Sequence, residues 1–275
     1  LKNENETLPL KRGSRVAVFG KAQADYVKGG GGSGDTTVAY VRSLAQGLRM
    51  KQDEGKIEVF EPLERFYAEN VKVQYAAGAP PGKTREPILA DELVQQARAF
   101  TDTALITICR FSGEDYDRTG QPHDGDYFLS FEEEHMVKKV LAAFPRVAVV
   151  LNTGGMMDTL WFKDHPAVGA ALLAWQGGME GGLAAADILV GDACPSGHLT
   201  DTFASSFAAY PSSANFAESR MYVEYQEDVF VGYRYFETIP GAADSVCYPF
   251  GFGLSYTTFA LGNVTGGLND AGEIV

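Results

Sequence analysis

The stretch RVAVVLN, residues Arg146–Asn152, has the clearest buried-strand pattern in the chain. Its continuous run of β-branched and aliphatic residues is typical of a strand that is covered on both faces. A second such run, TALITI at 103–108, lies upstream. Between the two, Ser130 with Glu133 three residues later has the form of a capping box that opens a helix to Ala143. Strand, helix and strand in this order predict two parallel strands joined by a crossover helix.

The same alternation continues in both directions from this unit. Upstream, the pattern predicts strands at 15–20, 56–62 and 71–76 and helices at 37–49, 63–69 and 89–100. Downstream, it predicts a short strand within 167–175 and a helix at 183–191. We therefore expect a layered α/β architecture with a mostly parallel sheet flanked by helices. Beyond Gly191, several prolines and many Gly, Ser and Tyr residues predict long ordered loops.

The composition is that of an ordinary globular protein, with 45% hydrophobic and 21% charged residues among 275. A net charge of −13 argues against nucleic-acid binding, because phosphate contacts need a basic surface. No apolar run approaches the roughly 20 residues that span a membrane. Three scattered cysteines fit a reducing, cytoplasmic compartment, and no Cys/His pair has the spacing of zinc ligands. We expect neither a metal ion nor a cofactor.

The glycine-rich run KGGGGSGD, residues 28–35, permits three interpretations. It contains the G-x-G-x-x-G spacing of dinucleotide sites, but about ten residues separate it from the preceding strand, whereas such a site follows its strand directly. A flexible surface loop is the plainest interpretation. The third is a turn that brings backbone N–H groups and Ser33 close to a polar ligand.

Charged residues follow the strand at 103–108 abruptly. The segment RFSGEDYDR, residues 110–118, holds Arg110, Glu114 and Arg118 together with two aspartates. Ligands of open α/β sheets bind beyond the carboxyl ends of the strands, so this loop is a candidate site. A solvated cluster of salt bridges is the alternative, to which we give equal weight.

A third candidate is MYVEYQEDVFVGYRYFET, residues 221–238, where tyrosines interleave with carboxylates. Such a mixture suits sugar binding, because apolar sugar faces stack on aromatic rings and sugar hydroxyls need acceptors. A packed loop with satisfied tyrosine hydroxyls is the interpretation that we favour for most of these residues.

Taken together, these segments resemble glycoside hydrolase family 3. The matching segments occur in the order of the family: LKNENETLPL at 1–10, GGGGSGD at 29–35, RFSGEDYDR at 110–118, VAVVLNTGG at 147–155, LLAWQGGMEGGLAAADILVGDACPSGHLTDTF at 172–203, EDVFVGYRYFET at 227–238 and YPFGFGLSYTTF at 248–259. The resemblance covers nearly the whole chain. It implies the α/β-sandwich domain of the family, a layered (α/β)6-type sandwich that is similar to a six-stranded doubly wound layer.

The resemblance also implies roles for single residues. In members with an S-G-E-x-x-D-R segment the glutamate is the general acid/base, which corresponds to Glu114, although Asp115 stands where the family often has glycine. Ser33 matches a serine that contacts the sugar, and Arg110 and Arg118 are further candidates for substrate binding. The nucleophile and a Lys-His pair of the family lie on a (β/α)8 barrel, and the segments that carry them do not occur in this sequence.

The implied function is that of the acid/base-bearing domain of a retaining, exo-acting β-glycosidase that releases terminal β-linked glucose. Its implied partners are a β-glucoside or short β-linked oligosaccharide and the barrel domain of a parent protein. A β-xylosidase of the family is an alternative, as is a non-catalytic carbohydrate-binding or interaction domain. A β-N-acetylglucosaminidase is disfavoured by the intact S-G-E-x-x-D-R segment. Within a longer protein, we expect residues 1–258 to form the sandwich domain and residues 259–275 to begin a following module.

Overall fold

A computed structural model describes residues 1–116, 118–260, 262 and 265–274 of the chain. Its main sheet has the strand order β1-β6-β5-β4-β2-β3, with β1 antiparallel to β6 and the other neighbours parallel. The strands of this sheet are β1 (Lys2–Asn3), β2 (Ser14–Phe19), β3 (Ile57–Val59), β4 (Thr103–Arg110), β5 (Arg146–Thr153) and β6 (Val168–Leu173). The predicted six-stranded, mostly parallel sheet is thus confirmed among the described residues.

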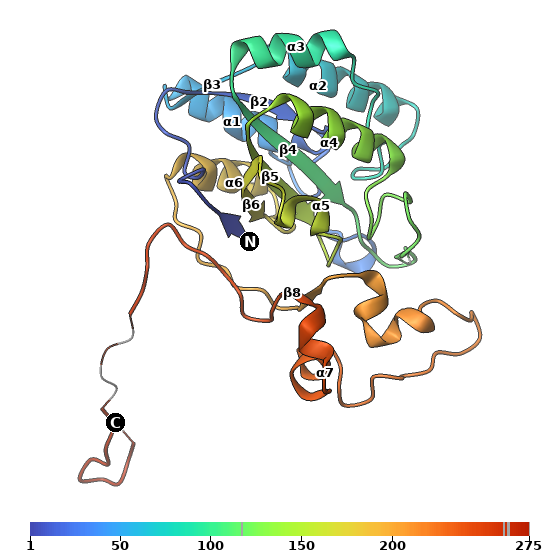
Figure 1. Ribbon diagram of the computed structural model, residues 1–275, viewed down its shortest axis with the longest axis vertical. Helices are drawn as coiled ribbons and strands as arrows, with labels where there is room; N and C mark the ends of the chain where they lie inside the picture. Colours follow the sequence, from blue (N-terminus) through green and yellow to red (C-terminus); the bar gives the residue numbers. More distant parts are fainter. Residues whose placement is uncertain (117, 261, 263–264, 275) are drawn as a thin grey trace.

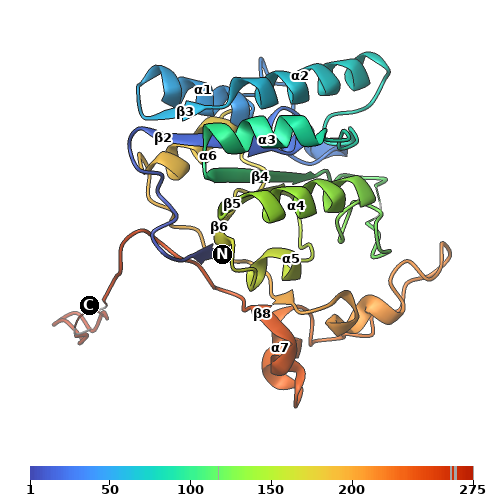
Figure 2. The ribbon, with the colours of Figure 1, turned by 45° about the horizontal axis from the view of Figure 1, so that its top comes forward.

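Helices cover both faces of this sheet (Figures 1 and 2). One face packs against α1 (Leu44–Asp53) and α6 (Gly181–Val190), and the other against α2 (Glu61–Ala76), α3 (Asp91–Phe100), α4 (Phe131–Ala143) and α5 (Leu160–Lys163). The alternation of side chains along β2 explains the two layers. Val16 and Val18 join the core beneath α1 and α6, whereas Ala17 and Phe19 join the opposite core. Both faces are buried, as the continuous apolar runs predict.

Residues 71–76, VKVQYA, do not form the predicted strand. They are the last turns of α2, whose buried residues Leu63, Tyr67 and Val71 recur every four positions on one face. Pro62 lies in the first turn, where its fixed φ favours a helix. Packing of that face against the sheet overrides the local β preference of the segment. The sixth strand is instead β1, at the N-terminus.

Capping residues set the starts of two other helices. The predicted helix at 37–49 begins only at Leu44, where Ser43 and Gln46 form a capping box. The predicted capping box of Ser130 and Glu133 is present and opens α4. Short-range capping patterns therefore locate helix starts better than apolar periodicity does in this chain.

Beyond α6 the chain forms long loops with short elements, as predicted. These elements are β7 (Phe203–Ala204), η3 (Phe207–Ala209), η4 (Pro211–Ala214), α7 (Tyr233–Thr238), η5 (Ala242–Ser245) and β8 (Val246–Tyr248). β7 pairs with β8, and residues 205–245 between them, which we call the arm, lie below the sandwich in both views (Figures 1 and 2). Tyr222 and Tyr225 are exposed, so the packed-loop interpretation does not hold for them.

Within the described ranges, no helix has both the length and the apolar character needed to cross a membrane. Of the predicted module start at 259–275, residues 261, 263–264 and 275 lie outside the described residues. The boundary at residue 258 stays a prediction.

Candidate functional site

β2 and β4 are parallel neighbours, and Phe19 at the carboxyl end of β2 pairs with Ile106, four residues before the end of β4. From β2 the chain crosses one face of the sheet through α1 to reach β3. It then returns along the opposite face, through α2 and α3, to β4 on the other side of β2. The connection from β2 leads to β3 on one side, and the connection from β4 leads to β5 on the other side. The pair β2 and β4 is therefore a topological switch point, where open α/β sheets bind ligands. The loops that carry Ser33 and Glu114 both begin here.

These two loops touch through their backbones. The Gly31 N–H donates to the Ser112 carbonyl over 2.9 Å, and Gly31 forms a parallel bridge with Gly113. A β-carbon added at Gly113 would lie 2.7 Å from the Gly31 backbone. The close approach therefore requires a glycine at this position, which supports the interpretation of the glycine run as a turn that meets a polar group.

The turn brings Ser33 directly onto Glu114. The Ser33 backbone N–H donates to Glu114 Oε2 over 3.0 Å, and the Ser33 hydroxyl donates to Glu114 Oε1. The hydroxyl hydrogen bond, aided by the N–H, holds the pKa of Glu114 below the usual range of a glutamate. The carboxyl group is exposed to solvent, so that a reactant can reach it.

Gly32 makes room for this carboxylate. Its φ is +78°, and a β-carbon there would lie 2.5 Å from the β-carbon of Glu114. Both the conformation and the lack of space exclude a larger residue at this position. The glycine run is thus a fitted surface around Glu114 rather than only a flexible loop.

The sequence analysis missed the residues that pack against the two loops, namely Phe111, Tyr116 and Lys83. The Phe111 ring lies against Gly31, so closely that a β-carbon at Gly31 would be 2.6 Å from the ring. The same ring packs edge-on against Tyr116, with 5.1 Å between the ring centroids. Lys83 places its ammonium 5.2 Å from the Tyr116 ring centroid, a cation–π distance. The aromatic residues on both sides of Glu114 were the available signal for this support.

Asp25 is a second missed residue. It is fully buried and accepts hydrogen bonds from the Lys21 ammonium at 3.2 Å, the Tyr75 hydroxyl at 2.6 Å and the Gly82 N–H at 2.6 Å. Burial would raise the pKa of Asp25, but the charge of Lys21 and these hydrogen bonds hold it below its usual range. The charged pair anchors the loop at Gly82, against which Phe111 packs.

Arg110 does not point toward a substrate, contrary to the prediction. Its guanidinium is buried, and all five of its N–H donors are used within the protein. Two pair with Glu133 over 2.8 Å each, and three reach the carbonyls of Cys109, Asp126 and Phe128. Arg110 therefore holds the start of the loop against α4 and has no donor left for a ligand.

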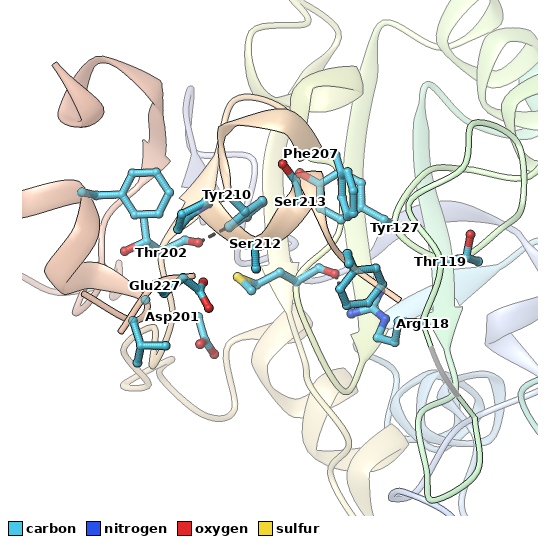
Figure 3. Close-up of a pocket in the computed structure, with 16 residues that line it drawn as sticks. Arg118, Thr119, Tyr127, Asp201, Thr202, Phe207, Tyr210, Ser212, Ser213 and Glu227 are labelled. Carbon is cyan, nitrogen blue, oxygen red and sulfur yellow. Dashed lines mark hydrogen bonds between the residues drawn. The ribbon is translucent and has the colours of Figure 1, made fainter. Parts of the chain in front are cut away.

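Arg118 occupies a more open position. Its Nε donates to Asp126 Oδ1 over 2.7 Å and its Nη1 donates to the Met156 carbonyl over 2.8 Å. The side chain is partly exposed and lines a cavity between the sandwich and the arm (Figure 3). A role in substrate binding stays a prediction for Arg118. Asp117, in the same segment, lies outside the described residues.

The arrangement suits proton transfer at an exposed carboxylate. Among the described residues, no group of three or more His, Cys, Asp or Glu side chains is arranged to hold a metal ion. A carboxyl group that two donors orient can protonate or deprotonate an atom placed beside it.

The amino-acid sequence matches the family model of the glycosyl hydrolase family 3 C-terminal domain over residues 1–256. It is 50% identical to beta-glucosidase A of Butyrivibrio fibrisolvens, with 95% of this chain and 34% of that protein aligned. It is 37% identical to a beta-glucosidase of Ruminococcus albus, with 98% of this chain and 28% of that protein aligned. The chain therefore spans about a third of the length of these relatives.

Solved structures of beta-glucosidases contain a domain with the same fold. The fold superposes on a beta-glucosidase from Paenibacillus barengoltzii with a TM-score of 0.86 and 40% identity, covering 98% of this chain and 29% of that one. It superposes on beta-glucosidase 3B from Thermotoga neapolitana, solved in complex with glucose, with a TM-score of 0.84 and 34% identity, covering 98% of this chain and 38% of that one.

Proposed function

The chain belongs to glycosyl hydrolase family 3, as a C-terminal domain of that family, and on this premise we propose that it supplies the general acid/base of a retaining, exo-acting β-glucosidase. Glu114 is the proposed acid/base. The observation that carries the proposal is the contact of Ser33 with Glu114 at the switch point between β2 and β4. Relatives that align over nearly the whole chain are named as beta-glucosidases.

The chemistry divides between two carboxyl groups. In a retaining mechanism one carboxyl group protonates the leaving oxygen while the other, about 5–5.5 Å away, attacks the anomeric carbon. The first group then removes a proton from the water that releases the sugar. Glu114 has the exposure that the first role needs. The proposed nucleophile lies on a (β/α)8 barrel in the remainder of a longer protein, of which the chain is about a third by the length of its relatives.

The two proton-transfer steps place opposite demands on Glu114. It must carry a proton when the glycosidic oxygen leaves and be a carboxylate when water attacks. The contact with Ser33 favours the carboxylate. Covering of the site by the barrel, together with a nearby nucleophile carboxylate, would raise the pKa of Glu114 in the assembled protein. Protonation is therefore expected to depend on domain assembly.

Substrate contacts complete the proposal. The Ser33 hydroxyl would change its hydrogen-bond partner from Glu114 to a hydroxyl of the bound glucose. Arg118 would contact the substrate at the edge of the site. The proposed substrates are β-glucosides and short β-linked oligosaccharides, and the proposed compartment is the cytoplasm.

The test is Glu114→Gln in the full-length protein. Glutamine keeps the size of the side chain and one acceptor oxygen for Ser33 but has no transferable proton. With poorly activated leaving groups, kcat/KM should fall by about 10²–10⁴-fold, the usual contribution of a positioned acid/base. A dinitrophenyl glucoside needs little protonation, so the glycosylation step should suffer much less, and added azide should partly restore turnover. An equal loss for good and poor leaving groups, without azide rescue, would show that Glu114 is not the acid/base.

A further inference from the structure

A cavity of about 380 Å³ separates the sandwich from the arm (Figure 3). The sandwich contributes Arg118, Thr119 and Tyr127, and the arm contributes Phe207, Phe216 and Glu227. Its volume lies within the range of about 300–1,000 Å³ that is typical of small-molecule sites. Glu227, from the segment 221–238, and Arg118 both line it, but the proposed acid/base chemistry does not account for it.

Aromatic rings form one part of the cavity wall. Phe207 packs edge-on against Tyr127 at 5.2 Å and against Phe216 at 5.9 Å between ring centroids. Phe216 is 45% exposed, so part of its ring is open to solvent. An aromatic ring with an exposed face can stack on the apolar face of a pyranose.

Hydrogen-bond acceptors form another part. Asp201 and Glu227 line the cavity, and Figure 3 shows both on the side opposite Arg118. The hydroxyls of Ser212 and Ser213 also line it. Carboxylates accept from neutral hydroxyl donors and repel anions, and the net charge of −13 adds to that repulsion. Rings beside such acceptors favour a neutral, hydroxyl-rich ligand.

The cavity borders the loop that carries Glu114, although Glu114 itself does not line it. Arg118 and Thr119 line it and belong to the same loop after β4 as Glu114. A glycosidase acid protonates the oxygen of the leaving group, so the acid lies between the two parts of the substrate. Ser33, on the glycine turn, is proposed to contact the released glucose. We assign the leaving group to the other side of Glu114, toward Arg118 and the cavity.

From this geometry we propose that the cavity between the arm and the sandwich binds the leaving-group sugars of a β-linked oligosaccharide. This inference rests on the proposed function and adds its preference for substrate length. Phe216 supplies the stacking surface and Glu227 an acceptor for sugar hydroxyls. A substrate without sugars beyond the cleaved bond does not reach the cavity.

A binding experiment tests the site without relying on catalysis. Cellotetraose is titrated into the chain and its affinity is measured by calorimetry or NMR. Phe216→Ala should weaken binding by about threefold to tenfold, the usual contribution of one aromatic contact. Glu227→Gln should weaken it by a similar factor. Phe131→Ala is the matched control, because this ring is 67% exposed and is not part of the cavity wall. Absence of saturable binding, or affinity unchanged by both cavity variants, would overturn the proposal.

A kinetic experiment in the full-length protein separates this inference from the proposed function. The measured quantity is the ratio of kcat/KM for cellotetraose to kcat/KM for a nitrophenyl glucoside. Phe216→Ala and Glu227→Gln should lower the ratio, whereas Phe131→Ala should leave it unchanged. An unchanged ratio in both cavity variants refutes the leaving-group site even if Glu114→Gln behaves as an acid/base variant. Failure of the Glu114→Gln test with cellotetraose bound in the cavity would refute the catalytic role alone.

Discussion

Ser33 holds Glu114 from two atoms, a backbone N–H at 3.0 Å from Oε2 and a hydroxyl that donates to Oε1. The two residues are 81 positions apart in the sequence and come from loops that follow neighbouring strands. Both hydrogen bonds favour the ionised carboxyl group. The contact thus sets the position and the protonation of the proposed catalytic group together.

Replacing Ser33 by alanine should move the pH profile of the full-length protein. Without the Ser33 hydroxyl the pKa of Glu114 rises, because the hydrogen bond that stabilises the carboxylate is lost. The acid step needs protonated Glu114, so the alkaline limb of kcat/KM should move to higher pH. Ser33→Thr keeps a hydroxyl and should retain the wild-type limb. A limb that stays in place, or moves to lower pH, would contradict the prediction.

Replacing Gly32 by alanine should displace Glu114. The new β-carbon would lie 2.5 Å from the β-carbon of Glu114, at a φ of +78°. A misplaced catalytic group can cost about 10²-fold, so kcat/KM in the full-length protein should fall on that scale. Gly34→Ala is the matched control, since nothing lies within 4 Å of a β-carbon there. Equal activity in the two variants would refute the explanation that Gly32 is needed to make room for Glu114.

Removing Arg110 should destabilise the fold rather than weaken substrate binding alone. Arg110→Met leaves Glu133 buried without its partner, which typically costs about 3–5 kcal/mol. Burial would raise the pKa of Glu133, but the charge and hydrogen bonds of Arg110 outweigh it and hold that pKa below its usual range. Arg110→Met/Glu133→Gln removes the unpaired charge and should recover part of the loss. Urea unfolding measures both, and equal losses would contradict the ion-pair explanation.

Glu86 should make the stability of the chain decline with rising pH. Burial raises the pKa of Glu86 to about 8 in the folded state, against about 4.3 for an unfolded glutamate. Its favourable contribution is therefore complete below about pH 4 and is lost as the pH rises to about 8. Glu86→Gln has no proton to lose and keeps an acceptor for the Lys21 N–H. The unfolding free energy of the variant, relative to that of the wild type, should increase as the pH rises from about 4 to about 8. A difference that does not change with pH would contradict the prediction.

The chain by itself should not hydrolyse a nitrophenyl β-glucoside. Retention requires a second carboxyl group about 5–5.5 Å from the first, and the proposal places it in the remainder of the full-length protein. The assay compares the purified chain with the full-length protein at equal concentration. Turnover by the chain at rates typical of enzymes, about 1–1000 per second, would refute the divided active site.

The sequence by itself determined the class of fold and the identity of the proposed acid/base. Apolar runs such as Arg146–Asn152 and the capping box of Ser130 and Glu133 act over a few residues, so that local pattern is enough to locate them. Glu114 was singled out differently, by the resemblance of its S-G-E-x-x-D-R segment to glycoside hydrolase family 3, because the local pattern alone left a solvated salt-bridge cluster equally weighted. Local pattern failed at 71–76, where burial of one face of α2 against the sheet outweighed the β preference of the segment.

Only the tertiary structure decided which polar partners the charged residues contact and which of them keep no hydrogen-bonding group for a ligand. Both Arg110 and Glu114 follow the same strand, yet the first turns inward to Glu133 and the second outward to Ser33. Nothing within a few residues of either distinguishes these directions. The strand order, which places β2 beside β4 and α4 behind β4, brings together side chains that are far apart along the chain. Long-range packing sets that order, because it depends on burying both faces of one sheet at once.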